Sequence, residues 1–150
     1  MKNIVVVDID GTLSVVGERM KYIEQEPKDW RRFYADKFDD EPIPEVCGLV
    51  RELSRTYSII FCTSRSECVR QQTQLWLQRH LAMSPRDYTL IMRASSDERP
   101  DVESKIDSFV AETTAAERNA TSFVLEDSPA MAEAWKAAGY TCLQVVVGDR

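Results

Sequence analysis

The sequence predicts an α/β fold, a three-layer sandwich in which helices cover both faces of a five-stranded parallel sheet. Short apolar runs alternate along the chain with segments whose apolar residues recur at helical spacing. Strand and helix alternate four times after the first strand, a pattern typical of a parallel sheet with helices on both faces. With 150 residues, the chain fits one domain over residues 1–150 and can bury a core of ordinary size.

Five segments have the composition of strands. Ile4–Val7 is a continuous apolar, β-branched run that leads to a turn dipeptide, Asp10-Gly11, as expected of a buried strand. The other predicted strands span residues 57–62, 88–92, 122–125 and 141–147. In open parallel sheets ligands bind beyond the carboxyl ends of the strands, so the residues that follow each strand are the first candidates for a site.

Four helices are predicted between these strands, the first over residues 45–55. Their ends carry signals from Pro44, Ser64 or Ser66, Asp101, and Ser128 with Pro129, and Gly139 is placed to end the last helix. The predicted buried faces are Val46, Leu49, Val50 and Leu53; Val69, Thr73, Trp76 and His80; Val102, Ile106, Phe109 and Val110; and Met131, Ala134, Trp135 and Ala138.

Residues 14–43 interrupt the alternation. At about 30 residues the segment is longer than an ordinary strand-to-helix loop, and it is rich in charged and aromatic residues. Long excursions of this kind are often lids, so we expect a small cap or flap after the first strand. Within it, residues 30–34 (WRRFY) pair aromatic with basic side chains. They fit either a base-stacking site or an amphipathic helix that covers the sheet edge, and both roles are compatible.

Charge and hydropathy exclude several classes of protein. The net charge of −6 is unlike that of proteins that bind nucleic acid along a groove, so any such contact should be local and at an end. The longest apolar runs, Ile4–Val7 and residues 145–147, are far shorter than the roughly 20 residues of a membrane span. The N-terminus runs directly into the first strand without the features of a signal peptide, so we expect no export.

The cysteines indicate a reducing compartment. Cys47, Cys62, Cys68 and Cys142 form no CxxC pair, and His80 is the single histidine. A zinc site or a disulfide framework is therefore not expected, and we predict a cytoplasmic protein with free thiols.

Chemically active residues follow each of the first four strands. They are Asp8, Asp10 and Thr12; Thr63, Ser64 and Arg65; Arg93, Asp97, Arg99, Asp101 and Lys105; and Glu126 and Asp127. Carboxylates that converge on one edge repel one another unless a cation lies between them, and oxygen ligands favour Mg²⁺. Hydroxyl groups, backbone N–H groups and positive charge beside them are what a phosphoryl group requires.

Each of these features also has a purely structural interpretation. Asp-Gly-Thr is a common turn after a strand, and Thr63-Ser64 can serve only as a helix cap. Lys105 can be a solvated charge, and Glu126-Asp127 can interact only with a helix dipole. Their joint occurrence at successive strand ends favours the functional interpretation.

The residues Asp8-Ile9-Asp10-Gly11-Thr12-Leu13, Thr63, Lys105 and Glu126-Asp127 resemble the four ordered motifs of the haloacid dehalogenase (HAD) superfamily. The resemblance covers nearly the whole chain and implies a HAD-like Rossmannoid fold. It also implies phosphoryl chemistry, because an aspartate two residues after the nucleophile marks the phosphatases and mutases of this superfamily.

The resemblance implies a role for each motif residue. Asp8 is the expected nucleophile and Mg²⁺ ligand, and Asp10 the expected acid–base, whose backbone carbonyl also contacts the metal. Thr63 is expected to bind phosphate, and Lys105 to neutralise charge. Asp127 is expected to anchor Mg²⁺, with Glu126 replacing an aspartate as the outer acidic ligand.

A closer resemblance is to the 3′-phosphatase domain of phage polynucleotide kinase-phosphatase. Arg19, Arg65 after Thr63-Ser64, the run Arg99, Asp101 and Lys105, and residues 141–149 carry it. We therefore expect Thr12, Arg19, Thr63, Ser64, Arg65 and Arg99 to bind substrate or phosphate. No G-x-x-x-x-G-K-[ST] loop is present, so no kinase half is expected.

The resulting hypothesis is a Mg²⁺-dependent phosphomonoester hydrolase that acts through an aspartyl-phosphate on nucleic-acid 3′-phosphate ends or nucleotides. Two alternatives stay open. One is a phosphatase for a small non-nucleotide metabolite, and the other is an inactive phosphate-binding regulatory protein.

Overall fold

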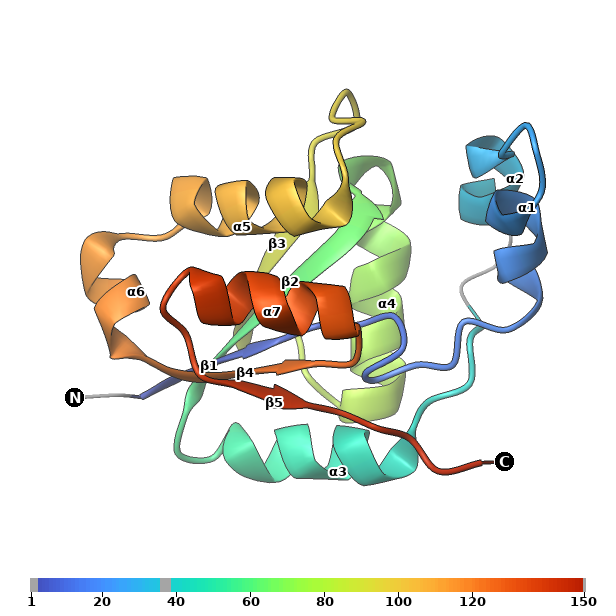
Figure 1. Ribbon diagram of the computed structural model, residues 1–150. Coiled ribbons are helices and arrows are strands. Elements are labelled where there is room, and N and C mark those ends of the chain that lie inside the picture. The colour runs from blue at the N-terminus through green and yellow to red at the C-terminus, as the bar shows by residue number, and fades with distance from the viewer. Residues whose placement is uncertain (1–2, 36–38, 150) are drawn as a thin grey trace.

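The sheet has the predicted architecture. The computed structural model describes residues 3–35 and 39–149 of the chain. Its strands are β1 (Ile4–Val7), β2 (Ser58–Ser66), β3 (Tyr88–Arg93), β4 (Thr121–Glu126) and β5 (Cys142–Gln144). They form one all-parallel sheet with the order β3-β2-β1-β4-β5 (Figure 1). The predicted five-stranded parallel α/β fold is confirmed.

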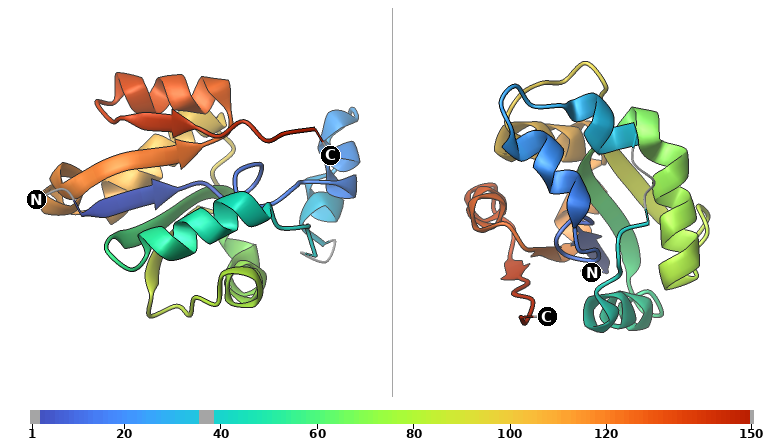
Figure 2. Two further views of the ribbon diagram at one scale, coloured as in Figure 1. Left: turned by 90° about the horizontal axis from the view of Figure 1, so that it is seen from below. Right: turned by 90° about the vertical axis from the view of Figure 1, so that its right-hand side faces the viewer.

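Helices cover both faces of the sheet (Figures 1 and 2). On one face lie α3 (Pro44–Leu53) and α4 (Arg70–Leu81), and on the other α5 (Asp101–Glu112) and α7 (Pro129–Ala137). The central strand β1 is buried on both faces, with Val5 and Val7 in one apolar cluster and Ile4 and Val6 in the other. Burial on both sides explains why this strand has a continuous apolar sequence rather than an alternating one.

The order of the strands places the site. Strand β1 lies between β2 and β4, with Val7 opposite Phe61 on one side and Leu125 on the other. The chain passes from β1 to β2 and β3 on one side and then crosses back to β4 on the other side of β1, and such a reversal opens a crevice at the carboxyl ends of the strands. The residues that follow these positions are Asp8, Cys62 and Glu126.

The insertion lies beyond the carboxyl ends of the strands (Figure 1). It contains the 3-10 helix η1 (Glu18–Met20) and the helices α1 (Lys21–Glu24) and α2 (Trp30–Ala35). Its two arms are joined near the core, where the N–H of Val15 donates to the carbonyl of Glu41 (2.8 Å) and that of Ile43 to the carbonyl of Leu13 (2.7 Å). Part of the predicted 14–43 flap, residues 36–38, lies outside the described residues.

Several details of the predicted helix faces are wrong. Leu49, Val102, Val110 and Ala138 are exposed rather than buried. In α5 the buried side chains are Ser104, Lys105 and Phe109. Because this helix turns Lys105 inward, Val110 lies about 140° away around its axis and faces solvent. Asp101 is the first residue of α5, whose N-cap position is Pro100, so the predicted aspartate cap is also wrong.

The structure also contains a helix that periodicity alone does not predict. Helix α6 (Ala115–Ala120) begins with a capping box, in which the side chains of Thr114 and Glu117 bind each other's backbone N–H groups. Ser66 caps the 3-10 helix η2 (Glu67–Val69) just before α4. Strand β5 is shorter than predicted, and Val146 beyond it is exposed. None of the helices in residues 3–35 and 39–149 is long and apolar enough to cross a membrane.

Candidate active site

Three carboxylates and one lysine meet where β1 and β4 end. Lys105, which reaches the site from α5, places its Nζ 2.7 Å from Oδ1 of Asp8 and 3.0 Å from Oε2 of Glu126. Asp127 follows Glu126 and completes the group. Both Asp8 and Lys105 are buried. We refer to Asp8, Lys105, Glu126 and Asp127 as the strand-end cluster.

The turn after β1 brings Asp127 close to Asp8. The Oγ1 atom of Thr12 lies 3.0 Å from Oδ2 of Asp8 and 3.1 Å from Oδ1 of Asp127, so its hydroxyl can donate to either carboxylate. Gly11 has a φ of +87°, and a Cβ atom at this position would lie 2.2 Å from Oδ2 of Asp127. Only glycine adopts this conformation at low cost, and only glycine leaves room for the carboxylate.

The strand-end cluster holds an excess of negative charge. Burial raises the pKa of Asp8 to about 6, although the adjacent Lys105 acts in the opposite direction. Burial and the neighbouring Asp8 carboxylate raise the pKa of Glu126 to about 7. Burial alone would lower the pKa of Lys105, but Asp8 and Glu126 hold it above its ordinary value, so the lysine stays charged.

The same residues fit a divalent metal ion. Asp8, Glu126 and Asp127 each offer a carboxylate oxygen, and the three oxygens lie within 4.8 Å of one another. The donors are all oxygens, as Mg²⁺ prefers. One lysine does not balance three carboxylates, and burial raises the pKa of Asp127 as well. A cation at this position would relieve the cost of ionising them.

Asp10 belongs to a second group of charges that joins the sheet to the insertion. Arg65 binds its carboxylate through two contacts, Nε to Oδ2 at 2.9 Å and Nη2 to Oδ1 at 2.6 Å. The Nη2 atom of Arg19 lies 3.5 Å from Oδ1 of Asp10. Arg19 in turn binds Asp40 through two contacts of 3.1 and 2.5 Å. We refer to Asp10, Arg19, Asp40 and Arg65 as the arginine network.

Packing holds both arginines in place. Arg65 is buried, and its Nη1 lies 3.2 Å from Oγ1 of Thr73 on α4. Arg19 is buried against the ring of Phe33, with its guanidinium carbon 4.6 Å from the ring centroid. Burial alone would raise the pKa of Asp10, but Arg65 and then Arg19 outweigh this effect and hold the pKa below its ordinary value.

Thr63 and Ser64 lie where β2 passes the site. Thr63 is buried, and its Oγ1 accepts a hydrogen bond from the backbone N–H of Arg65 (3.1 Å). The carbonyl of Ser64 accepts from Nε of Arg93 (3.2 Å). Both residues thus help to fix the backbone around Arg65, and their predicted contact with phosphate stays a prediction.

Arg99 lies apart from the two groups. Its guanidinium binds the carboxylates of Asp97 and Asp107 at 3.0 and 2.5 Å and is about half exposed. Arg93 instead ties the loop before α5 together, by donating to the carbonyls of Asp97 and Arg99 and to Asp101.

Two of these residues, Arg93 and Asp40, are not among the predicted catalytic, metal or phosphate contacts. Arg93 was one of several polar residues after the third strand, and its position at the end of that strand was the available signal. Nothing in the sequence around Asp40 indicates a place in the site, because the path of the insertion alone brings it there.

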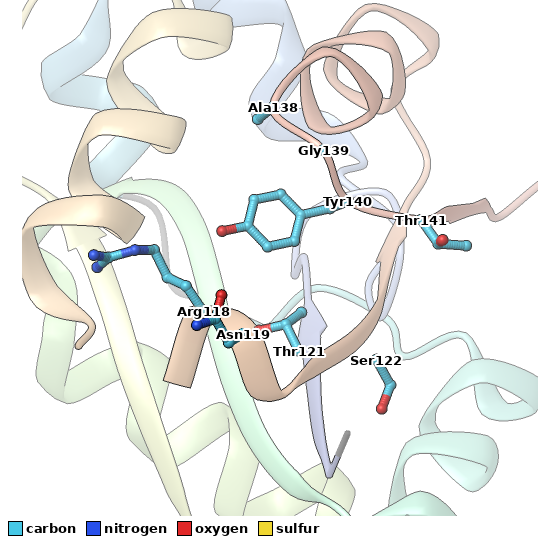
Figure 3. Close-up of a pocket in the computed structure, with 8 residues that line it drawn as sticks. All are labelled: Arg118, Asn119, Thr121, Ser122, Ala138, Gly139, Tyr140 and Thr141. Carbon is cyan, nitrogen blue, oxygen red and sulfur yellow. The ribbon is translucent and has the colours of Figure 1, made fainter. Parts of the chain in front are cut away.

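A separate pocket lies at the opposite end of the strands, where β4 begins (Figure 3). It is lined by Arg118, Asn119, Thr121, Ser122, Ala138, Gly139, Tyr140 and Thr141. Thr121 and Glu126 are the two ends of β4, so the pocket and the strand-end cluster are about 17 Å apart along the strand. None of the predicted site residues lines this pocket.

The geometry agrees with comparisons to known proteins. The family described as "Polynucleotide kinase PNKP phosphatase domain" matches residues 2–150. No curated protein matches the chain at the sequence level.

Solved structures show the same fold at low sequence identity. A chain of a Pnkp1/Rnl/Hen1 complex is 23% identical with a TM-score of 0.73, and the match covers 100% of this chain and 48% of that chain. A chain of the Pnkp1/Rnl/Hen1 RNA repair complex is 23% identical with a TM-score of 0.75, over 99% of this chain and 44% of that one. The chain thus spans less than half the length of these two relatives.

A third structure places the fold more broadly. A haloacid dehalogenase-like hydrolase from Streptococcus pneumoniae is 16% identical with a TM-score of 0.66, over 96% of this chain and 84% of that one. Together with the family match, these likenesses agree with the resemblance that the motifs indicated. The chain belongs to the family of polynucleotide kinase PNKP phosphatase domains within the HAD superfamily, and it is an enzyme, a HAD-type phosphatase.

Proposed function

We propose that this enzyme is a Mg²⁺-dependent phosphomonoester hydrolase that acts through an aspartyl-phosphate on Asp8, with nucleic-acid 3′-phosphate ends or nucleotides as substrates. The observation that carries the proposal is the placement of Asp8. Its carboxylate is buried between a charged lysine, 2.7 Å away, and the carboxylate of Asp127. This arrangement gives a nucleophile with a cation on one side and metal-binding oxygens on the other.

The proposed reaction has two displacements. In the first, an oxygen of Asp8 attacks phosphorus while the bond to the ester oxygen breaks, and Asp10 donates a proton to that departing oxygen. In the second, water attacks the same phosphorus, Asp10 accepts the proton of the water, and the bond to Asp8 breaks to release phosphate. After the first displacement Asp10 is ionised and can accept a proton. After the second, Asp8 is free again and Asp10 is protonated.

The remaining residues stabilise and orient the phosphoryl group. Lys105 is fixed beside Asp8 and offers positive charge to the oxygens of the transferring group. Asp8, Asp127, Glu126 and the backbone carbonyl of Asp10 are the proposed metal ligands, and bound Mg²⁺ would neutralise charge that develops on the phosphoryl oxygens. Thr12, Thr63, Ser64, Arg19, Arg65 and Arg99 are the proposed contacts to phosphate or substrate.

Asp10 must change partner to perform its proposed role. In the resting arrangement Arg65 binds both of its carboxylate oxygens. A proton donor has to lie within hydrogen-bond reach of the leaving oxygen, and such contacts often form only once the substrate is bound. We therefore propose that the Asp10 side chain turns away from Arg65 when substrate enters. Because the arginines hold its pKa low, Asp10 takes up from solvent, as it leaves them, the proton that it then donates to the leaving oxygen.

The proposed substrate class rests on the family and on the two Pnkp1 structures, one of which is described as an RNA repair complex. The insertion adds only three short helical segments in its described part, which leaves room for the end of a polymer. We also propose that the enzyme works in the cytoplasm, where Cys47, Cys62, Cys68 and Cys142 would remain free thiols.

Phosphate release separates the candidate substrates. The assay compares a 3′-phosphorylated oligonucleotide with 3′- and 5′-mononucleotides and with small sugar phosphates, each with Mg²⁺ and with a chelator. We expect the oligonucleotide or the 3′-mononucleotide to have the highest kcat/KM, and the chelator to abolish release. Preference for a sugar phosphate would indicate a metabolite phosphatase. Binding of phosphate without turnover would indicate a regulatory protein.

A further inference from the structure

Asp40 is a buried carboxylate to which neither the motifs nor the proposed mechanism gives a role. Its side chain is only 7% exposed. Both of its oxygens bind Arg19, and Oδ2 also lies 3.5 Å from Nη2 of Arg65. Asp40 therefore contacts the same two guanidinium groups as Asp10, from the side of the insertion.

The backbone of Asp40 is fixed to the core. Its carbonyl accepts a hydrogen bond of 2.9 Å from Nε1 of Trp76, a buried residue on α4. The next residue, Glu41, pairs with Val15 on the opposite arm of the insertion. These contacts place the Asp40 carboxylate independently of Asp10.

The charges of the arginine network balance. Two guanidinium groups face two carboxylates, and Arg19, Arg65 and Asp40 are largely buried. When Asp10 turns to the leaving oxygen, the arginines lose one partner, and an unpaired buried charge is strongly disfavoured. Among the residues that the structure describes, Asp40 is a carboxylate that stays in contact with both of them.

We propose that Asp40 is a positioning residue that holds Arg19 and Arg65 in place so that Asp10 can leave them and serve the departing oxygen. This inference rests on the proposed function, since it assigns a reason for Asp10 to move. It adds a residue and a step that the motifs do not contain. In this role Asp40 acts through the two arginines and needs no contact with substrate or metal.

Turnover of two substrates with different leaving groups tests the proposal. The variants are Asp40→Asn, Asp40→Glu and the matched control Asp39→Asn, whose exposed carboxylate pairs with Arg79 at the surface. In Asp40→Asn we expect kcat for a nucleoside 3′-phosphate to fall by about 10²-fold, the loss expected when catalytic groups are displaced by about 1 Å.

The second substrate is p-nitrophenyl phosphate, whose leaving group is stable without a proton. We expect a clearly smaller loss of kcat with it, partial recovery in Asp40→Glu, and wild-type rates in Asp39→Asn. An equal loss for both substrates, or no loss, would overturn the proposal, because a purely structural role does not depend on the leaving group.

A spectroscopic measurement tests the same proposal without turnover. The Nε–H signal of Arg19, which donates to Oδ1 of Asp40, and the Nη–H signal of Arg65, whose Nη2 lies 3.5 Å from Oδ2 of Asp40, are recorded by NMR in Asp10→Asn and in the double variant with Asp40→Asn. We expect both signals to persist in the single variant and to disappear in the double one. Loss of both in Asp10→Asn alone would show that Asp40 does not hold the arginines. Inactivity of the wild type on all substrates would instead refute the proposed function and leave this measurement decisive.

Discussion

The strand-end cluster and the arginine network lie side by side and differ in charge balance. The cluster has three carboxylates for one lysine, and the pKa values of Asp8 and Glu126 are raised. The network has two carboxylates for two arginines, and the pKa of Asp10 is lowered. The contrast shows that the pKa values of two aspartates only two residues apart are shifted in opposite directions by their surroundings. Asp8 lies in a group with excess negative charge that the proposed metal ion would balance, whereas Asp10 is already paired with two arginines.

We expect the largest effect from a substitution that changes the strand-end cluster alone. Asp8→Asn keeps the size of the side chain but removes the proposed nucleophile, and loss of a catalytic nucleophile costs about 10⁶-fold in kcat. Phosphate release with Mg²⁺ measures this loss. Because the arginine network is untouched, we expect the variant to remain folded by thermal unfolding. Appreciable turnover by Asp8→Asn would contradict the proposed covalent mechanism.

A pH series separates the two groups without a substitution. The ordinary pKa values of Asp8 and Glu126, 3.8 and 4.5, rise to about 6 and about 7 in the folded protein. Between these limits the folded, metal-free protein binds more protons than the unfolded chain, so these groups lower the free energy of unfolding as pH rises. A shift of about 2 pKa units corresponds to roughly 3 kcal/mol.

The arginine network contributes with the opposite sign. Since the pKa of Asp10 is lowered, its stabilising effect is present above its ordinary pKa of 3.8 and is lost as pH falls through the lower folded value. Mg²⁺ binds ionised carboxylates, so we expect its effect on Tm to be small at about pH 5 and large at about pH 8. Thermal unfolding with Mg²⁺ and with a chelator measures both. An equal shift at both pH values would contradict the assignment of the metal to the cluster.

Gly11 follows Asp10 and packs against Asp127, so substituting it perturbs the strand-end cluster rather than the arginine network. In Gly11→Ala the new Cβ would meet Asp127, and the positive φ would be strained, which together cost about 1–3 kcal/mol. We expect a lower Tm and a higher Mg²⁺ concentration for half-maximal activity. Gly48→Ala is the control, because Gly48 lies within α3 where a Cβ meets nothing within 4 Å. That variant should be as stable as the wild type or more so.

We expect the smallest effect from a substitution in the loop before α5, which lies outside the strand-end cluster and the arginine network. Arg99 pairs with carboxylates at the surface, and exposed pairs of this kind contribute little to stability. We expect kcat/KM to fall by at most about 5-fold in Arg99→Ala. Arg93→Ala should cost more, because Arg93 joins this loop to the backbone of Ser64. A greater loss in Arg99→Ala would support its predicted contact with substrate.

The sheet and the strand-end residues could be predicted because local sequence determines them. Ile4–Val7 is apolar on both faces and is therefore recognisable as a buried strand. Asp8 comes next in the sequence, so its place at the end of that strand follows directly. The face of α5 could not be read correctly from apolar residues, because Lys105 occupies part of the buried face. Helix α6 has little apolar periodicity, and only its capping box marks it.

Contacts between distant segments were not predictable. Asp40 is 25 residues before Arg65 in the sequence, and nothing in either segment indicates that they meet. Their contact depends on the path of the insertion and on the hydrogen bond from Trp76. The exchange of partners proposed for Asp10 therefore could be inferred only from the three-dimensional structure.

The burial of Arg19, Arg65 and Lys105 has a consequence for how a substrate arrives. Each cation is paired with carboxylates inside a protein of net charge −6, so a phosphate ester in solution approaches a molecule that is negative overall. At physiological salt such fields extend only about 8 Å, and added salt would speed capture rather than slow it. Extra phosphates along a polymer add repulsion instead of attraction. For the proposed polymeric substrate, this charge distribution favours contact with a single phosphate at the chain end and release of the polymer after the reaction.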